Sequence, residues 1–367
     1  MRFPEFSGEW NKYTINDLAT VVGGGTPDTT VKSYWGGDIQ WFTPSEIGKN
    51  KYVDFSKRTI TRDGLDNSSA KLLPLHTILL SSRATVGECS IASNECTTNQ
   101  GFQSLIAKQC NIDFLYYLIQ TKKKDLIRNA CGSTFLEISA NEIRKIKVAV
   151  PVQNEQEQIA KLLSLIDERI ATQNKIIEDL KKLKSAIRKK VFVSLKEEHT
   201  ECCEINQLLT YEQPTAYIVT NDEYSTDTTL IPVLTANKGF VLGYTDEDFG
   251  IYQKGECIIF DDFTMDAKYV SFPFKVKSSA IKMLTAKPNV NLRFMFEYLS
   301  YLELKSEEHK RHYISEIASL VVELPSKEMQ NKIASLMTSL DNKLALEENT
   351  SVRYEDEKQY LLSQMFI

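Results

Sequence analysis

The chain lacks the sequence features of several large protein classes. Its seven cysteines are odd in number and none are spaced C-x-x-C, which argues against a disulfide framework and against a structural zinc site. No apolar run reaches about 18 residues, so no membrane-spanning helix is expected. The segment from Met1 to Glu5 holds an acidic residue and no apolar run, which predicts no signal peptide. We therefore expect a cytoplasmic protein.

An excess of positive charge is also missing. The net charge is −5, so the overall composition does not indicate a nucleic-acid-binding protein. The charge is unevenly distributed, however. Residues 1–150 contain 18 basic and 15 acidic side chains, whereas residues 201–324 contain 11 basic and 19 acidic ones. This asymmetry argues against uniform electrostatic binding along the chain.

Catalytic motifs are absent as well. The segment from Gly23 to Pro27 is not G-x-G-x-x-G and is better explained as a turn. Neither Asn-Pro-Pro-Tyr nor Asp-Pro-Pro-Tyr occurs, so the usual catalytic motif of an adenine amino-methyltransferase is missing. Glu303 and Lys305 imitate part of a nuclease Glu-x-Lys motif without its Pro-Asp partner, and a solvated helix face explains them better. The sequence therefore predicts no catalytic residue and no metal site.

An internal repeat is the most informative feature that is present. The segment from Pro151 to Asp167 recurs as the segment from Pro325 to Asp341, at a constant offset of 174. Pro, Gln, Ile, Ala, Leu and Asp return at matching places without a gap. Chance is a poor explanation, so the chain is predicted to be a duplicated structure.

Both repeats continue as long helices without Gly or Pro, the first over residues 153–195. Apolar residues follow one another in alternating steps of four and three, which is a heptad pattern. We predict that the two helices pair as an antiparallel coiled coil; the alternative is that each packs only on its own domain. The predicted seam consists of Ile159, Leu163, Ile166, Ile170, Ile177, Leu180 and Ile187 in the first helix and Ile333, Met337, Leu340, Leu344, Tyr354 and Leu361 in the second.

The segments before the two helices correspond weakly, and both combine short alternating strands with turn residues and one or two helices. The predicted fold class is therefore α+β, in two domains that are each followed by a long helix. The predicted boundaries are residues 1–150 for the first domain, 151–200 for the central helix, 201–324 for the second domain and 325–367 for the C-terminal helix.

The domain layout and several short sequence motifs, called words below, resemble the specificity subunits of type I restriction-modification enzymes. The second half carries fewer of these words than the first and lacks a counterpart of Thr-Asn-Gln-Gly. The words are Gly24–Pro27, Trp41–Ile47, Leu80–Gly87, Thr98–Phe102 and Pro151–Ile170, and in the second half Ile231–Thr235 and Pro325–Leu344.

This resemblance implies two target-recognition domains that each read one half of a split double-stranded DNA site. The two helices would form a spacer of pseudo-twofold symmetry and would dock two modification subunits. Those partners, not this chain, would bind S-adenosylmethionine and methylate adenine N6, and a motor subunit would complete the nuclease. The chain itself is expected to be non-catalytic and to bind no cofactor.

Polar and basic residues near these words are the candidate DNA contacts, because phosphate contacts position a protein on DNA and polar side chains read base edges. An alternative is a non-catalytic coiled-coil scaffold whose two domains bind proteins, which the acidic second domain favours. The candidates are Thr43, Ser45, Lys49, Arg83, Thr85, Asn99 and Gln100 in the first domain and Thr235, Asn237, Lys238, Tyr244, Lys254 and Lys268 in the second.

Overall fold

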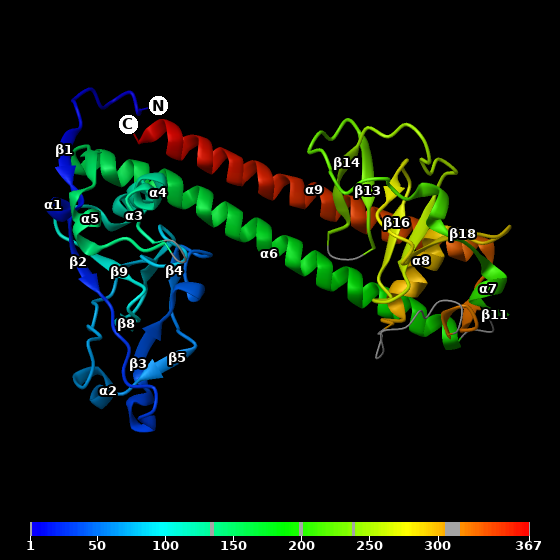
Figure 1. The fold of residues 1–367 in the computed structure, drawn as a ribbon, viewed down its shortest axis with the longest axis horizontal. Coiled ribbons are helices and arrows are strands. Elements are labelled where there is room, and N and C mark those ends of the chain that lie inside the picture. Colours follow the sequence, from blue (N-terminus) through cyan, green and yellow to red (C-terminus); the bar gives the residue numbers. More distant parts are fainter. Residues whose placement is uncertain (1, 133–135, 198–200, 237–238, 305–315, 367) are drawn as a thin grey trace. The chain divides into compact units, whose positions relative to one another are not determined.

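The computed structural model describes residues 2–132, 136–197, 201–236, 239–304 and 316–366 (Figure 1). It divides into two compact units, which are described separately below. Unit 1 contains Met1–Asn174 and Asn349–Ile367, and unit 2 contains Lys175–Glu348. Each long helix therefore contributes one segment to each unit. The mixture of strands and helices in both units confirms the predicted α+β class.

Unit 1 is built on a five-stranded sheet of order β2-β9-β6-β7-β4 and a three-stranded sheet of order β5-β3-β8. Its elements are β1 (Asn11–Thr14), α1 (Ile15–Leu18), β2 (Ala19–Gly23), η1 (Lys32–Tyr34), β3 (Trp35–Phe42), η2 (Pro44–Glu46), β4 (Tyr52–Val53), β5 (Arg58–Ile60), α2 (Arg62–Asp66), β6 (Ile78–Leu80), β7 (Cys89–Ala92), β8 (Cys96–Thr98), β9 (Gln103–Ala107), α3 (Ile112–Thr121), α4 (Lys123–Arg128), α5 (Ala140–Lys145), β10 (Lys147–Val150) and the first part of α6 (Gln153–Glu197).

The five-stranded sheet of unit 1 has two buried faces because side chains alternate along a strand. Ile78 and Leu80 of β6 pack with Phe114 of α3 and Leu163 of α6 in one core cluster. Leu79, between them, belongs to a second cluster that includes Phe42 of β3 and Phe102. One face is therefore covered by helices, and the other carries the strands that lead to the surface loops.

Unit 2 repeats this plan with a four-stranded sheet of order β12-β18-β15-β16 and a three-stranded sheet of order β14-β13-β17. Ile258 and Ile259 of β15 again point into different core clusters. The elements are β11 (Glu201–Glu204), α7 (Ile205–Leu208), β12 (Leu209–Glu212), η3 (Pro214–Tyr217), β13 (Ile231–Leu234), β14 (Val241–Thr245), β15 (Cys257–Asp261), β16 (Ala267–Val270), β17 (Lys275–Val276), β18 (Ile281–Ala286), α8 (Leu292–Tyr301), β19 (Val321–Leu324) and the first part of α9 (Lys327–Met365).

The segments of α6 and α9 run antiparallel within each unit. In unit 1 Lys358 Nζ lies 2.7 Å from a carboxylate oxygen of Asp167, and Ser351 Oγ lies 2.9 Å from Asn174 Oδ1. In unit 2 Lys184 Nζ lies 2.5 Å from a carboxylate oxygen of Asp341. The two Asp–Lys pairs are the same pair at the repeat offset of 174, with the helices exchanged. The predicted antiparallel pairing is thus made twice, once in each unit.

The seam residues lie along one stripe of each helix. Ile159, Leu163, Ile166, Ile177, Ile333, Met337 and Leu361 are buried, whereas Ile170, Leu180, Ile187, Leu340, Leu344 and Tyr354 are half-buried. Helix α6 ends at Glu197, two residues beyond the predicted end, and α9 ends at Met365.

Two buried glutamines explain why Pro and Gln recur at the start of both helices. Gln156 Nε2 donates to the carbonyl of Pro151 at 3.0 Å, and its Oε1 accepts the backbone N–H of Asn111 at 3.0 Å. Gln330 makes the same two bonds, to Pro325 at 2.9 Å and from Asn291 at 2.8 Å. The Asn residue that each glutamine holds caps the helix on which the long helix packs. The repeated motif therefore fixes the first turns of α6 to unit 1 and the first turns of α9 to unit 2.

Candidate functional site

Short motifs that are far apart in the sequence of unit 1 lie together just after the ends of strands β3 and β8. The backbone N–H of Asn99 donates to the carbonyl of Phe42 at 3.0 Å, and that of Gly25 donates to the carbonyl of Thr98 at 2.8 Å. The N–H of Ser82 donates to the carbonyl of Gly101 at 2.8 Å. Three loops and one turn of the resemblance therefore form a single surface, which we call the loop cluster of unit 1. It is defined by Gly24–Pro27, Thr43–Ile47, Ser82–Thr85 and Asn99–Gly101.

Close packing holds this cluster together. A Cβ atom placed on Gly24 would lie 2.0 Å from the carbonyl oxygen of Asn99, so only glycine fits there. The indole N–H of Trp41 donates to the carbonyl of Gly25 at 2.9 Å. The glycine run is therefore a loop that approaches another backbone closely, as the sequence analysis expected of a turn.

Thr43 and Ser45 lie where β3 ends and η2 begins. The Thr43 hydroxyl donates to a carboxylate oxygen of Glu46 at 2.6 Å and lies 3.1 Å from the Ser45 hydroxyl. Glu46 also accepts the N–H of Thr43, which completes a capping box. Ser45 is exposed and Thr43 is half-buried. Thr43 therefore shapes the turn, and Ser45 presents its hydroxyl to solvent.

Asn99 and Gln100 lie on the loop after β8. The Asn99 side-chain oxygen accepts the N–H of Gly101 at 2.9 Å, so its amino group keeps the capacity to donate. Gln100 is exposed, and its side-chain oxygen accepts the hydroxyl proton of Thr26. Both side chains can thus offer donors to an acceptor outside the protein.

Arg83 and Thr85 lie on the loop that joins β6 to β7. The guanidinium of Arg83 is half exposed and lies 3.0 Å from a carboxylate oxygen of Glu137, while the Thr85 hydroxyl lies 2.9 Å from that of Ser81. Between them Ala84 has a φ of 63°, an uncommon value for a residue with a side chain. Lys49 is exposed, and a Cβ placed on the preceding Gly48 would lie 2.7 Å from a carboxylate oxygen of Glu88. The hydrogen bonds between these segments thus bring six of the seven candidates of unit 1 together, and none of those bonds involves Lys49.

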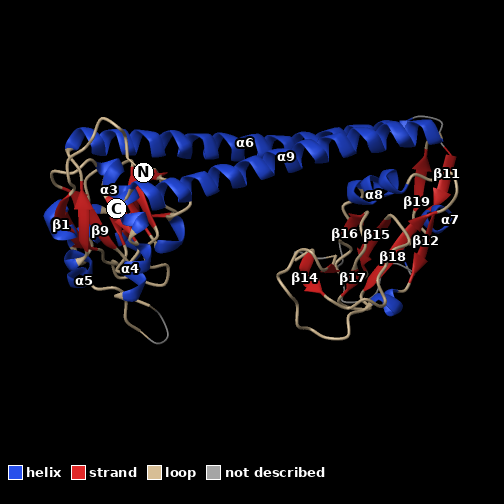
Figure 2. Ribbon diagram, turned by 90° about the horizontal axis from the view of Figure 1, so that it is seen from above, coloured by secondary structure: helices blue, strands red, loops and turns tan. Residues whose placement is uncertain are grey.

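Thr235 directly follows β13, which pairs in parallel with β17 in unit 2. Thr43 directly follows β3, which pairs in parallel with β8 in unit 1, so the two threonines are at equivalent positions. The candidates Asn237 and Lys238 lie outside the described residues. Tyr244 is half-buried on β14, opposite Pro232 of β13. β14 and β17 lie on the side of unit 2 away from the segments of α6 and α9 (Figure 2).

The remaining two candidates of unit 2 are not brought together. Lys254 is exposed, and its ammonium lies 2.8 and 2.9 Å from the two carboxylate oxygens of Glu212 on β12. This hydrogen bonding raises the pKa of Lys254 and lowers that of Glu212. Lys268 lies on β16, at the opposite edge of the same sheet. These two lysines therefore do not extend the surface around Thr235.

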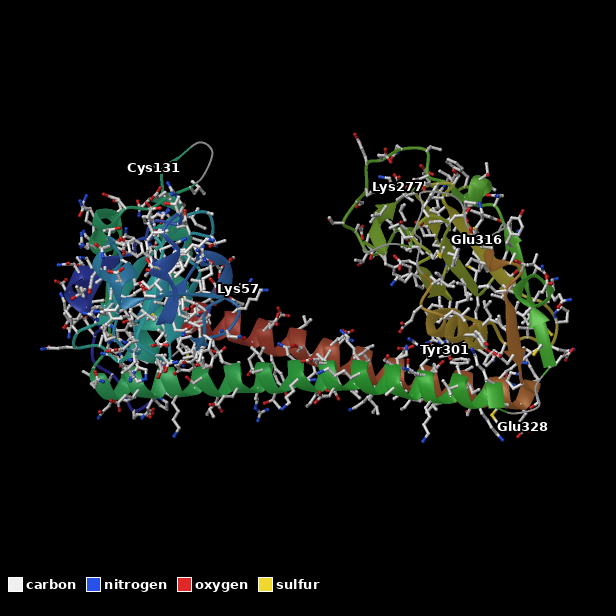
Figure 3. The ribbon with its side chains drawn as sticks, turned by 90° about the horizontal axis from the view of Figure 1, so that it is seen from below. Lys57, Cys131, Lys277, Tyr301, Glu316 and Glu328 are labelled. Carbon is white, nitrogen blue, oxygen red and sulfur yellow. The ribbon has the colours of Figure 1, made fainter. Side chains whose placement is uncertain are left out.

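Two exposed basic residues of unit 1, Lys57 and Arg58, were not among the candidates of the sequence analysis. The guanidinium carbon of Arg58 lies 3.6 Å from the centroid of the Trp35 ring, and both Arg58 and the neighbouring Lys57 are exposed. The backbone N–H of Lys57 donates to a carboxylate oxygen of Glu46 at 2.6 Å, which places it beside the Thr43 turn. Figure 3 labels Lys57 at the surface of unit 1. The Lys-Arg pair close to tryptophans was the signal that could have indicated them.

No group of three or more His, Cys, Asp or Glu side chains in the described part of the chain could hold a metal ion. Among the described helices, none is long and apolar enough to cross a membrane.

The architecture is that of a duplicated protein with two β-rich units, each closed by antiparallel helix segments. A family model described as type I restriction modification DNA specificity domain matches residues 7–182 and again residues 199–353. The chain belongs to this family, which confirms the resemblance drawn from the sequence.

Curated relatives carry the same description. The chain is 36% identical over 219 residues to the type I restriction enzyme MjaIX specificity subunit of Methanocaldococcus jannaschii, covering 58% of this chain and 50% of that protein. It is 41% identical over 142 residues to the EcoR124I/EcoR124II specificity subunit of Escherichia coli, covering 37% of this chain and 35% of that protein. The matches span about half the length of these relatives or less.

Solved structures share the fold over the whole chain. The S subunit of a type I restriction-modification system from M. genitalium gives a TM-score of 0.63 at 17% identity, covering 100% of this chain and 99% of that one. A chain from a study of type I restriction-modification complex assembly gives a TM-score of 0.60 at 12% identity, covering 98% of both chains. At these identities the likeness shows the fold alone.

Proposed function

We propose that this chain is the DNA-reading specificity subunit of a type I restriction-modification enzyme, with one half of a split target read by each unit. The observation that carries the proposal is the double match to the specificity-domain family, together with the loop cluster that the family words form in unit 1. Exposed hydroxyl, amide and guanidinium groups are gathered there. They can donate hydrogen bonds to phosphate oxygens and to the acceptors of base edges in the major groove.

Catalysis would belong to the partners of this chain. Modification subunits would dock on the helices, bind S-adenosylmethionine and transfer its methyl group to adenine N6. The side chains of the loop cluster support a binding role, since Ser45 and Gln100 are exposed. This chain would bind DNA and position it, and it would carry no cofactor of its own.

Sequencing of methylated bases in the host tests the proposal. Cells with the modification subunit and this chain should carry one asymmetric, split motif that disappears when this chain is deleted. The purified chain alone should transfer no methyl group from S-adenosylmethionine to DNA. An unchanged methylation pattern after deletion would contradict the proposed function and favour the protein-binding scaffold, for which the acidic residues of the second half are the supporting observation.

A further inference from the structure

The parallel strand pairs of the two units identify equivalent positions that the sequence does not align. In unit 1 Trp41 pairs with Thr97 and Phe42 with Thr98. In unit 2 Val233 pairs with Lys275 and Leu234 with Val276. The next N–H in each unit continues the ladder: that of Asn99 donates to Phe42 at 3.0 Å, and that of Lys277 donates to Leu234 at 3.1 Å. Lys277 therefore occupies the place of Asn99.

The loop that follows supports this equivalence. In unit 1 it passes beside Ser82, whose N–H donates to Gly101 at 2.8 Å. In unit 2 it passes beside Asp262, whose N–H donates to Ala280 at 3.0 Å. Ala280 lies three residues after Lys277, whereas Gly101 lies two residues after Asn99. The loop of unit 2 is therefore one residue longer than the loop of unit 1. This insertion and the different side chains explain why the second half lacks a recognisable Thr-Asn-Gln-Gly.

The Lys277 side chain is also less tightly held than the other lysines around it. It is 47% exposed, and its ammonium lies 3.8 Å from a carboxylate oxygen of Asp222, itself 82% exposed. Lys275 is fully buried and lies 2.5 Å from Glu247, and Lys282 lies 3.3 Å from Asp262 with both side chains 1% exposed. Lys254 is held by two oxygens of Glu212. A surface pair as open as that of Lys277 contributes little, so the ammonium can exchange it for another anion.

Figure 3 labels Lys277 on the side of unit 2 away from the helix segments of that unit. Thr235 follows Leu234, to which the N–H of Lys277 is bonded, so the two residues lie side by side at the ends of β13 and β17. This repeats the arrangement of Thr43 and Asn99 in unit 1. Both pairs place a threonine and a residue with a side-chain nitrogen at the ends of two adjacent parallel strands.

We propose that Lys277 is a DNA-contacting residue of unit 2 and that it replaces, with a charged donor, the amide donor that Asn99 offers in unit 1. The inference rests on the proposed function. The ammonium would donate to an electronegative acceptor of the second half-site, either a phosphate oxygen or the O6 and N7 of a guanine. Because the Lys277 ammonium would lie directly beside its acceptor, the acidic composition of the second half would not prevent this contact.

The test is DNA binding by the complex with its modification subunits, measured for the unaltered chain and for Lys277→Ala at several salt concentrations. A guanine contact predicts a loss of about 5- to 150-fold, together with relaxed preference at a base pair of the second half-site only. A phosphate contact predicts uniform weakening across sequences and a salt slope reduced by about one. Lys277→Arg should retain most of the affinity in both cases.

Lys287→Ala is the matched control, because it removes one positive charge from unit 2 at a lysine that donates to the carbonyl of Asn206. It should leave sequence preference unchanged. The inference is overturned if Lys277→Ala binds with the affinity, motif and salt slope of the unaltered complex. Failure of the unaltered complex to bind any DNA sequence preferentially would instead overturn the proposed function, and the two failures are thus distinguishable.

Discussion

Unit 1 and unit 2 share a backbone frame but differ in charge at equivalent positions. Thr97 in unit 1 corresponds to Lys275 in unit 2, and Asn99 corresponds to Lys277. Tyr117, six residues after its helix-capping Asn, corresponds to Glu297. Each time a neutral side chain of unit 1 is replaced by a charged one in unit 2. The shared backbone therefore depends on strand register and on the helix seam, and it tolerates a change of charge at these three positions.

The same comparison explains part of the acidic excess of unit 2. Glu297 is fully buried and lies 2.8 Å from Arg188, 2.7 Å from Arg293 and 3.6 Å from Lys184. Glu247 and Asp262 are paired with buried lysines. These carboxylates neutralise internal cations and do not contribute an acidic surface. Net charge is therefore a poor guide to what unit 2 can bind.

The largest effects are expected at the helix seam, where the units should behave alike. Leu163 and Met337 are separated by the repeat offset and are both 0% exposed. Replacing either with Ala should lower the free energy of unfolding by about 2–5 kcal/mol, because it removes buried methyl groups and leaves a cavity.

Tryptophan fluorescence follows the urea unfolding of unit 1, because Trp10, Trp35 and Trp41 all lie in that unit, whereas circular dichroism follows both units. Leu163→Ala should shift the tryptophan-monitored transition, whereas Met337→Ala should shift the transition in circular dichroism. Leu165→Ala, at a position 49% exposed, is the control and should change stability by less than about 0.5 kcal/mol. Equal stability of Met337→Ala and the unaltered chain would show that the seam is not repeated.

A smaller loss of stability should distinguish the two units when the equivalent residues Tyr117 and Glu297 are substituted. Glu297→Gln removes the carboxylate that Arg188, Arg293 and Lys184 share, although Arg293 and Lys184 keep a second one, Asp341. Leaving a fully buried charge without its partner would cost about 3–5 kcal/mol. The side chains of the three cations are 15–20% exposed, so a loss near the lower end is expected. Tyr117→Phe removes only a hydroxyl that donates to Asp167 at 2.6 Å, a loss of about 1.5–3 kcal/mol. Urea unfolding of both variants would contradict this account if Tyr117→Phe were the more damaging.

The smallest of these effects is a difference in acid sensitivity. Burial raises the pKa of Glu247, but hydrogen bonds from Lys275 and Thr220 outweigh burial and lower it from 4.5 to about 2. The depressed pKa stabilises unit 2 fully above about pH 4.5, and this contribution is lost as the pH falls toward 2.

Unit 1 has no matching carboxylate–lysine pair at this position, since the Thr97 hydroxyl donates to the carbonyl of Gln40 at 2.8 Å. Thermal unfolding of Glu247→Gln should therefore depend less on pH between about 4.5 and 2 than that of the unaltered chain. An identical pH profile for the two proteins would mean that Glu247 does not carry this sensitivity.

The sequence predicted the repeat and the helices well, because both depend on regular spacing of apolar residues. It also proposed Thr43, Ser45, Asn99 and Gln100 as candidates, and the β3–β8 pairing brings these four residues together. It did not propose Lys277, because the equivalence of Lys277 and Asn99 follows from strand register and not from residue identity. Arg58 was missed for a related reason, since its stacking on Trp35 depends on how β3 and β5 pair.

The most direct test of separate reading by the two units is an exchange of residues 204–320 for those of a family member with a different target. Both helices and all of the loop cluster of unit 1 stay unchanged in this chimera. Methylated motifs are then sequenced in cells that carry the chimera and the modification subunit. The account predicts that one half-site changes to that of the donor protein and that the other half-site is retained. A chimera that methylates DNA with both half-sites changed, or with neither changed, would contradict it.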